Sequence, residues 1–99
     1  MRLSDEQIQA IRRTVSETAG AAAGVRVFGS RLHDHARGGD LDLLVELPDP
    51  VEHPAALSAQ LSARIGRLLH GRRVDVVLLA PNLRRTSVHE VALRDGQKL

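Results

Sequence analysis

The stretch Gly39-Asp40-Leu41-Asp42-Leu43-Leu44-Val45-Glu46-Leu47 decides the fold of this chain. It alternates polar and apolar residues and then becomes almost wholly apolar, which is typical of a strand with one buried face. We therefore predict a strand over 40–47, with Asp40 and Asp42 on the same face. Side chains two residues apart lie about 7 Å apart along a strand, a spacing that suits two hard cations about 4 Å apart. Magnesium is the natural ion for such a pair of carboxylates.

A glycine turn precedes this strand. Gly29-Ser30 stands eleven residues before Asp40, at the exit of the apolar run 25–28. A run of this length between glycines is typical of a buried strand that ends in a tight turn. A nucleotide triphosphate needs backbone N–H groups at close range, and Gly29 lets phosphate oxygens approach the main chain, while Ser30 adds a hydroxyl donor. The next residue, Arg31, is a secondary candidate for clamping a phosphate.

A third carboxylate follows in a later apolar run. Asp75 stands thirty-three residues after Asp42, within the run 73–79 that we predict as a third strand near the centre of the sheet. A charge in a central strand is unfavourable unless it is paired. We therefore expect Asp75 to complete the metal site of Asp40 and Asp42 or to accept a proton.

Apolar residues at helical spacing predict helices around these strands. The predicted helices cover 5–19, 57–68 and 82–94, and their end signals are a capping box of Ser4 and Gln7 and glycines at Gly71 and Gly96. Residues 31–39 show neither the helical nor the strand spacing of apolar residues and are predicted to form a mobile loop. The order helix, strand, strand, helix, strand, helix predicts an α/β (α+β) fold, a small mixed sheet flanked by helices. We expect residues 1–99 to form a single domain, since 99 residues suit one core.

Composition argues against several classes of function. Phe28 is the one aromatic residue, so the chain has no platform on which bases could stack, and nucleic-acid binding is disfavoured. The formal net charge is only +2, and the arginine pairs are more typical of solvated faces than of a basic patch. Cysteine is absent, which excludes disulfides and zinc-thiolate sites. Without a long apolar run or a signal pattern, we expect a cytoplasmic protein with no membrane contact.

A resemblance to a known family is carried by three segments: Val27-Phe28-Gly29-Ser30-Arg31, Asp40-Leu41-Asp42-Leu43-Leu44-Val45 and Val74-Asp75-Val76-Val77. Together they resemble the minimal nucleotidyltransferases of the DNA polymerase beta superfamily. The order, spacing and strand setting of the motifs are more specific than any motif alone. The resemblance implies a nucleotidyltransferase fold like the palm of polymerase beta, and it covers nearly the whole chain.

The resemblance also implies roles for particular residues. Gly29 and Ser30 would contact the nucleotide phosphates, with Arg31 beside them, and Asp40, Asp42 and Asp75 would form the catalytic triad that binds two Mg²⁺ ions, for which Mn²⁺ could substitute. Small members of the family resemble antitoxins of helical HEPN-domain toxins, which they silence by binding or by transferring AMP from ATP to a toxin tyrosine. This chain contains no tyrosine, so a tyrosine acceptor would belong to another polypeptide.

Departures from the family pattern leave alternatives open. Many relatives continue Gly-Ser-Arg with Ala-Arg-Gly and place Ser directly before the first Asp, whereas this chain has Leu32-His33 and Gly39. The alternative is a catalytically weak or inactive module that neutralises a toxin by binding alone. In a purely structural interpretation, an arginine satisfies a strand carboxylate, and exposed loop histidines such as His33 and His35 serve solubility. The sequence does not fix which ATP-like nucleotide is used, which hydroxyl accepts, or whether a homo-oligomer forms.

Overall fold

A small mixed sheet organises the molecule. The computed structural model describes residues 3–29 and 40–99, so the predicted loop at 31–39 lies outside the described residues. The elements are α1 Asp5–Ala19, β1 Gly24–Phe28, β2 Leu41–Glu46, α2 Pro54–Leu68, β3 Val74–Leu79, α3 Ser87–Asp95 and β4 Gln97–Lys98. The strand order is β3-β2-β1-β4, with β1 antiparallel to β2 and β4, and β2 parallel to β3. This arrangement confirms the predicted α+β fold.

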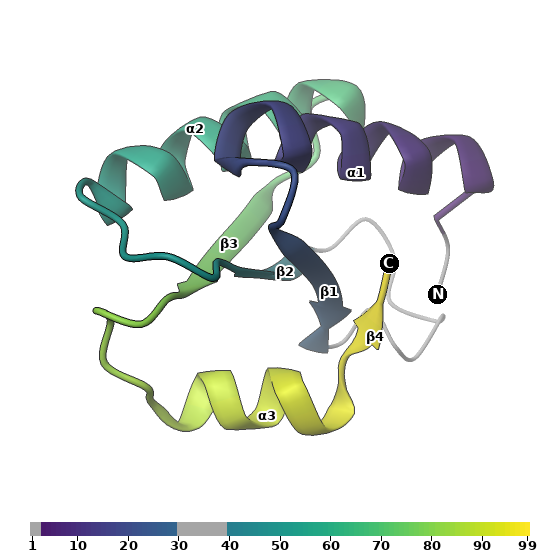
Figure 1. Cartoon of the computed structure of the whole chain (residues 1–99). Coiled ribbons are helices and arrows are strands. Elements are labelled where there is room, and N and C mark those ends of the chain that lie inside the picture. The colour runs from purple at the N-terminus through teal and green to yellow at the C-terminus, as the bar shows by residue number, and fades with distance from the viewer. Residues whose placement is uncertain (1–2, 30–39) are drawn as a thin grey trace.

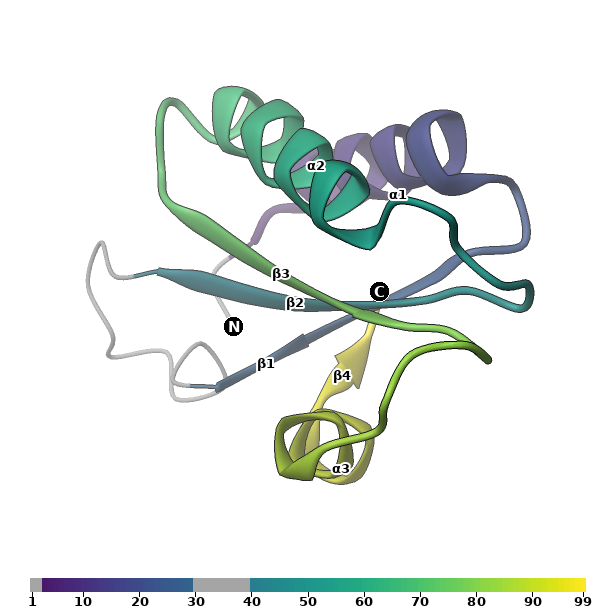
Figure 2. The same cartoon turned by 90° about the vertical axis from the view of Figure 1, so that its left-hand side faces the viewer.

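Helices cover both faces of the sheet. Helices α1 and α2 lie side by side over one face, and α3 crosses the opposite face (Figure 1; Figure 2). Helix α2 connects the parallel strands β2 and β3, which is the crossover that a parallel pair requires. No helix within the described ranges is long and apolar enough to cross a bilayer.

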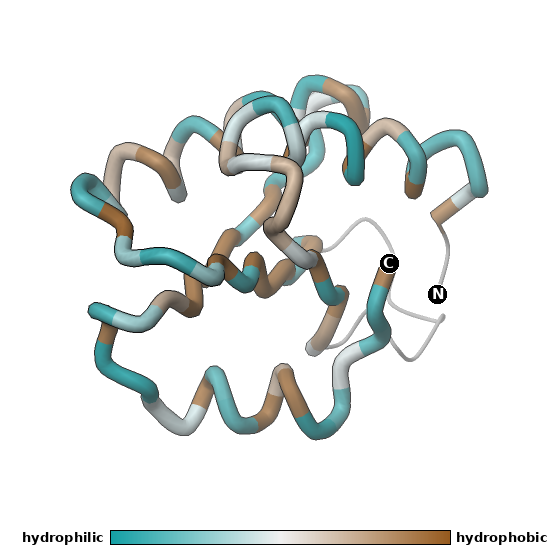
Figure 3. The backbone as a smooth tube through the Cα atoms, in the orientation of Figure 1, coloured by the Kyte–Doolittle hydropathy of each residue, from teal (hydrophilic) through white to brown (hydrophobic). Residues whose placement is uncertain are grey.

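The core lies on both sides of β2. Figure 3 shows that the central strands are rich in apolar residues. Leu43 and Val45 pack into the larger cluster beneath α1 and α2, whereas Leu44 packs with Phe28 into the smaller cluster under α3. All three β2 residues are fully buried. The continuous apolar run of this strand therefore reflects a sheet covered on both faces.

The predicted start of the first helix and the predicted end of the second are confirmed, whereas the second helix begins at Pro54, before the predicted 57. Ser4 Oγ accepts the Gln7 N–H at 3.1 Å while the Ser4 N–H donates to Gln7 Oε1 at 2.9 Å, which is the predicted capping box of α1. Helix α2 begins at Pro54, and beyond its last residue Gly71 adopts φ 82° and donates to the Gly66 carbonyl at 2.9 Å. Gly71 is therefore the left-handed stop that the sequence predicted.

The predicted start of the third helix is wrong. Helix α3 begins at Ser87, not at Asn82, because Asn82 is engaged elsewhere: its side chain accepts from the Val51 N–H at 3.0 Å and donates to the Val51 carbonyl at 2.8 Å. Thr86, in an extended conformation, is the N-cap. The short strand β4, which follows Gly96, then pairs with β1.

The predicted central position of the strand that carries Asp75 is also wrong, because β3 is an edge strand. The carbonyls of its alternate residues therefore point away from β2, and two of them are satisfied by side chains. Ser58 Oγ on α2 donates to the Val76 carbonyl at 2.7 Å, and His89 Nε2 on α3 lies 2.8 Å from the Leu78 carbonyl. Side chains from the two helix layers thus occupy acceptors that another strand would need.

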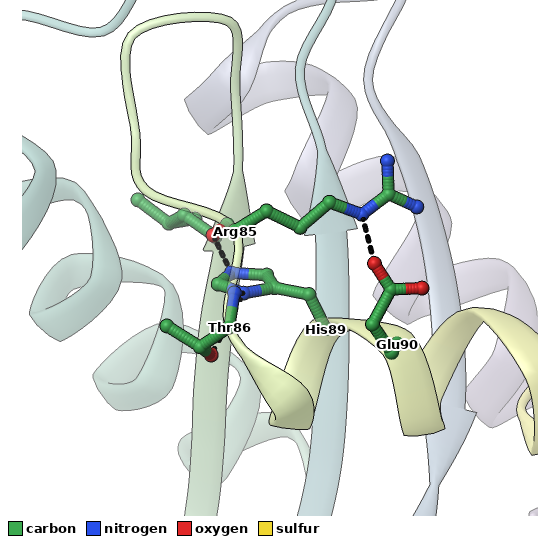
Figure 4. Close-up of polar contacts among 5 residues, drawn as sticks. Arg85, Thr86, His89 and Glu90 are labelled. Atoms are coloured by element: carbon green, nitrogen blue, oxygen red, sulfur yellow. Dashed lines mark hydrogen bonds and ion pairs between the residues drawn. The ribbon is translucent and has the colours of Figure 1, made fainter.

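His89 is a buried link between α3 and this edge. Its Nδ1 accepts the Thr86 N–H at 2.9 Å, so this nitrogen is unprotonated and Nε2 carries the proton that is donated to Leu78 (Figure 4). Beside it, Arg85 Nε and Glu90 Oε1 form an ion pair at 2.8 Å (Figure 4). The side chain of His89 therefore caps the helix and binds the edge strand with its two ring nitrogens.

Candidate active site

Two of the predicted carboxylates stand side by side. Asp42 of β2 and Asp75 of β3 are directly opposite each other in the parallel ladder. Residues opposite one another on neighbouring strands, about 4.8 Å apart, project to the same side of the sheet. This side is the one that α3 covers further along, because Leu44 and Val77, the next opposed pair on the same face, pack toward α3. The structure therefore brings Asp42 and Asp75 together on one face, at the end of the sheet that α3 leaves open.

The third carboxylate, Asp40, shares a loose arginine contact with Asp75. Asp40 directly precedes β2, two residues before Asp42, which places it on the same face. Arg73 Nε lies 3.7 Å from Asp40 Oδ2 and 3.5 Å from Asp75 Oδ1. The carboxylates of Asp40 and Asp75 are each about half exposed, so solvent and ions reach both of them.

Gly29 closes the site on the side of β1. Phe28 is opposite Asp42 in the antiparallel ladder, and Gly29 follows with φ +77°, a conformation that favours glycine. A Cβ atom at Gly29 would collide with the Asp42 carboxylate. The group that the structure places against this glycine is the carboxylate of Asp42, and the predicted approach of phosphate oxygens to Gly29 stays a prediction.

The remaining predicted residues lie outside the described part of the chain. Ser30 and Arg31, predicted to contact phosphate, fall in the segment 30–39, as do the loop histidines His33 and His35. The contribution of Ser30 and Arg31 to the site therefore stays a prediction.

Within residues 3–29 and 40–99, no three His, Cys, Asp or Glu side chains lie close enough together to form a metal site. The donor set is nevertheless of the right chemistry, since carboxylate oxygens are the ligands that Mg²⁺ and Mn²⁺ prefer. The Arg73 side chain that separates Asp40 from Asp75 is 75% exposed, so it can rotate into solvent without disturbing the core. The chemistry of Asp40, Asp42 and Asp75 thus suits Mg²⁺ or Mn²⁺, but their described positions do not bring all three around one ion, so their role as cation ligands stays a prediction.

The contact between Arg73 and Asp75 was not predicted from the sequence. The purely structural interpretation allowed for an arginine that satisfies a strand carboxylate, but it named no partner for Asp75. The signal was the spacing, because a residue two positions before Asp75 shares its face when the strand register extends that far. The Leu41 N–H donates to the Arg73 carbonyl at 3.0 Å, which shows that the register does extend to this residue.

Comparisons with known proteins agree with this architecture. A family model described as the nucleotidyltransferase domain matches residues 8–99. A crystal structure described as a toxin-antitoxin with AMP-PNP superimposes with a TM-score of 0.69 at 18% identity, over 97% of this chain and 72% of that chain. A crystal structure of the toxin-antitoxin MntA-HepT gives 0.66 at 16% identity, over 96% and 70%. These likenesses show the shared fold. No curated protein matches by sequence.

Proposed function

This chain belongs to the nucleotidyltransferase domain family, and on that premise we propose that it transfers a nucleoside monophosphate from a triphosphate to a hydroxyl group of a partner protein. The observation that supports this function best is the opposed pair Asp42 and Asp75, beside Gly29, where a Cβ atom would collide with the Asp42 carboxylate. Two strand carboxylates at an open sheet end, beside a glycine turn, make a binding place for a cation-neutralised phosphate group.

In the proposed site Asp40, Asp42 and Asp75 would hold two Mg²⁺ ions, or Mn²⁺ in their place. When bound, these ions neutralise charge on the triphosphate and favour ionisation of the attacking hydroxyl. The chain itself positions these groups: the β2–β3 register holds Asp42 beside Asp75, and Gly29 adds no Cβ atom against the Asp42 carboxylate. We assign Ser30 and Arg31 to the phosphates of the nucleotide.

The reaction we propose uses ATP as donor. The acceptor oxygen forms a bond to the α-phosphorus, the bond from that phosphorus to the pyrophosphate oxygen breaks, and the hydroxyl proton leaves to a base. The products are an AMP ester of the acceptor and pyrophosphate. Because the chain has no tyrosine, a tyrosyl acceptor lies on another polypeptide.

We further propose that the partner is a HEPN-type toxin, so that the chain acts as the antitoxin of the pair. The support is the fold shared with proteins described as toxin-antitoxin complexes, one of them with AMP-PNP. A second candidate, neutralisation by binding alone, is favoured by the Leu32-His33 sequence after the glycine turn and by the arginine that occupies the space between two of the carboxylates.

One experiment separates these candidates. The purified protein is incubated with α-³²P-ATP, Mg²⁺ and the protein encoded beside it, and transfer of label to that protein is measured. We expect labelling by the wild type, loss of labelling in Asp42→Asn and Asp75→Asn, and normal labelling in Asp49→Asn, an exposed aspartate away from the site. Growth rescue by Asp42→Asn equal to that of the wild type, without labelling by either protein, would favour binding alone.

A further inference from the structure

Arg73 lies among the carboxylates assigned to the metal ions, and its position there follows from the register of the sheet. Its carbonyl accepts the Leu41 N–H, so its side chain leaves the strand on the face of Asp40 and Asp75. Its Nε lies 3.7 Å from Asp40 Oδ2 and 3.5 Å from Asp75 Oδ1. A positive charge therefore stands where two negative side chains of the proposed site come together.

The geometry of these ion pairs argues against a structural role. Charge-assisted hydrogen bonds between nitrogen and carboxylate oxygen are about 2.7–2.9 Å long, and both Arg73 contacts are longer. The chain does make a tight pair elsewhere, since Arg26 Nε lies 2.7 Å from Glu46 Oε1 with only 25% of the Arg26 side chain exposed. An exposed, loose pair contributes little to stability.

We propose that Arg73 acts as an exchangeable counter-cation of the site. Before a nucleotide binds, its guanidinium neutralises Asp40 and Asp75 and competes with free divalent cations. When a cation and a triphosphate enter together, the guanidinium leaves the carboxylates and pairs with a phosphate oxygen, for which its planar donors are suited. This inference rests on the proposed function and adds a preference of the site for the cation-nucleotide complex over the cation alone.

The test compares the wild type with Arg73→Gln, Arg73→Lys and a control, Arg85→Gln, which removes the same charge from an arginine that pairs with Glu90 of α3. Binding of Mn²⁺ alone is measured by electron paramagnetic resonance, and binding of AMP-PNP with Mg²⁺ by calorimetry. Circular dichroism checks that each variant is folded. Neither readout requires enzyme activity.

We expect Arg73→Gln to bind Mn²⁺ roughly five- to tenfold more tightly, the factor that corresponds to repulsion between a unit charge and a divalent ion about 5 Å apart in dilute salt. The same variant should bind AMP-PNP with Mg²⁺ roughly tenfold more weakly, since one charged phosphate contact is lost. Arg73→Lys, which keeps the charge, and Arg85→Gln should stay within about twofold of the wild type for Mn²⁺, since each leaves a cation at the site.

Opposite changes in the two affinities are the signature of a counter-cation, and a structural residue would not produce them. Mn²⁺ affinity of Arg73→Gln equal to or below that of the wild type overturns this role, as does unchanged affinity for AMP-PNP with Mg²⁺. If Asp42→Asn still weakens Mn²⁺ binding in that case, the proposed transferase survives. Mn²⁺ binding that is insensitive to Asp42→Asn overturns both proposals.

Discussion

Replacing His89 by alanine should destabilise the fold strongly, because one ring nitrogen makes a buried hydrogen bond and the other a part-buried one. Loss of the Nε2 donor leaves the Leu78 carbonyl unsatisfied on a residue that is 7% exposed, which costs about 1–3 kcal/mol. Loss of the Nδ1 acceptor removes the partner of the Thr86 N–H at the start of α3, which costs about 0.5–2 kcal/mol. We therefore expect His89→Ala to lower the free energy of unfolding by about 2–4 kcal/mol, a large share of the roughly 5–15 kcal/mol typical of a domain.

The assay is urea unfolding followed by far-UV circular dichroism, since the chain has neither tryptophan nor tyrosine for fluorescence. A loss of this size should lower Tm by roughly 10–25 °C for a domain of this length. His89→Gln should fall between wild type and alanine, because a glutamine at this position can still accept from the Thr86 N–H. His53→Ala, whose side chain is 82% exposed, should change the free energy by less than about 0.5 kcal/mol. A His89→Ala protein within about 1 kcal/mol of the wild type would refute the assigned hydrogen bonds.

Two glycines give further predictions. Gly29→Ala should destabilise the fold by about 1–3 kcal/mol in urea unfolding, from positive φ and from the collision with the Asp42 carboxylate, and should weaken Mn²⁺ binding; unchanged Mn²⁺ affinity would contradict the close approach. Gly66→Ala lies in α2, where alanine is intrinsically better by about 1 kcal/mol. Its Cβ would nevertheless lie 2.9 Å from the Arg72 carbonyl oxygen, and overpacking of about 1–3 kcal/mol should outweigh that gain. A higher urea midpoint for Gly66→Ala would show that the backbone yields easily.

The parts of the fold that could be predicted from the sequence are those that depend on residues close together in the chain. The capping box fixes the start of α1, and Gly71 ends the turn after α2 because its φ of 82° favours glycine. The start of α3 was missed because Asn82 is held by the Val51 backbone, a contact between segments far apart in the chain. No local pattern in the sequence records such a contact.

The edge position of β3 could not be read from its composition. Its run Val74–Leu79 is as apolar as that of β2, because α2 covers one of its faces and α3 the other, just as they cover β2. An edge strand differs from a central strand in having no further strand beside it. On the outer side of β3, carbonyl groups accept hydrogen bonds from Ser58 and His89 instead. The capping role of His89 was not predicted, although a histidine three positions after Thr86 matches the position of a capping partner.

The face of the sheet on which Asp75 lies, in contrast, is determined by the packing of its apolar neighbours in the core. Val74, Val76 and Leu78 pack toward α1 and α2, so the residue between the first two must point to the other side, where Asp42 also points. A slip of β3 by one residue would bury Asp75 beneath α2 and expose the apolar set, which is strongly unfavourable. The register of the two carboxylates is therefore maintained by apolar packing on the opposite face, and a core substitution that loosens β3 should weaken cation binding before it unfolds the domain.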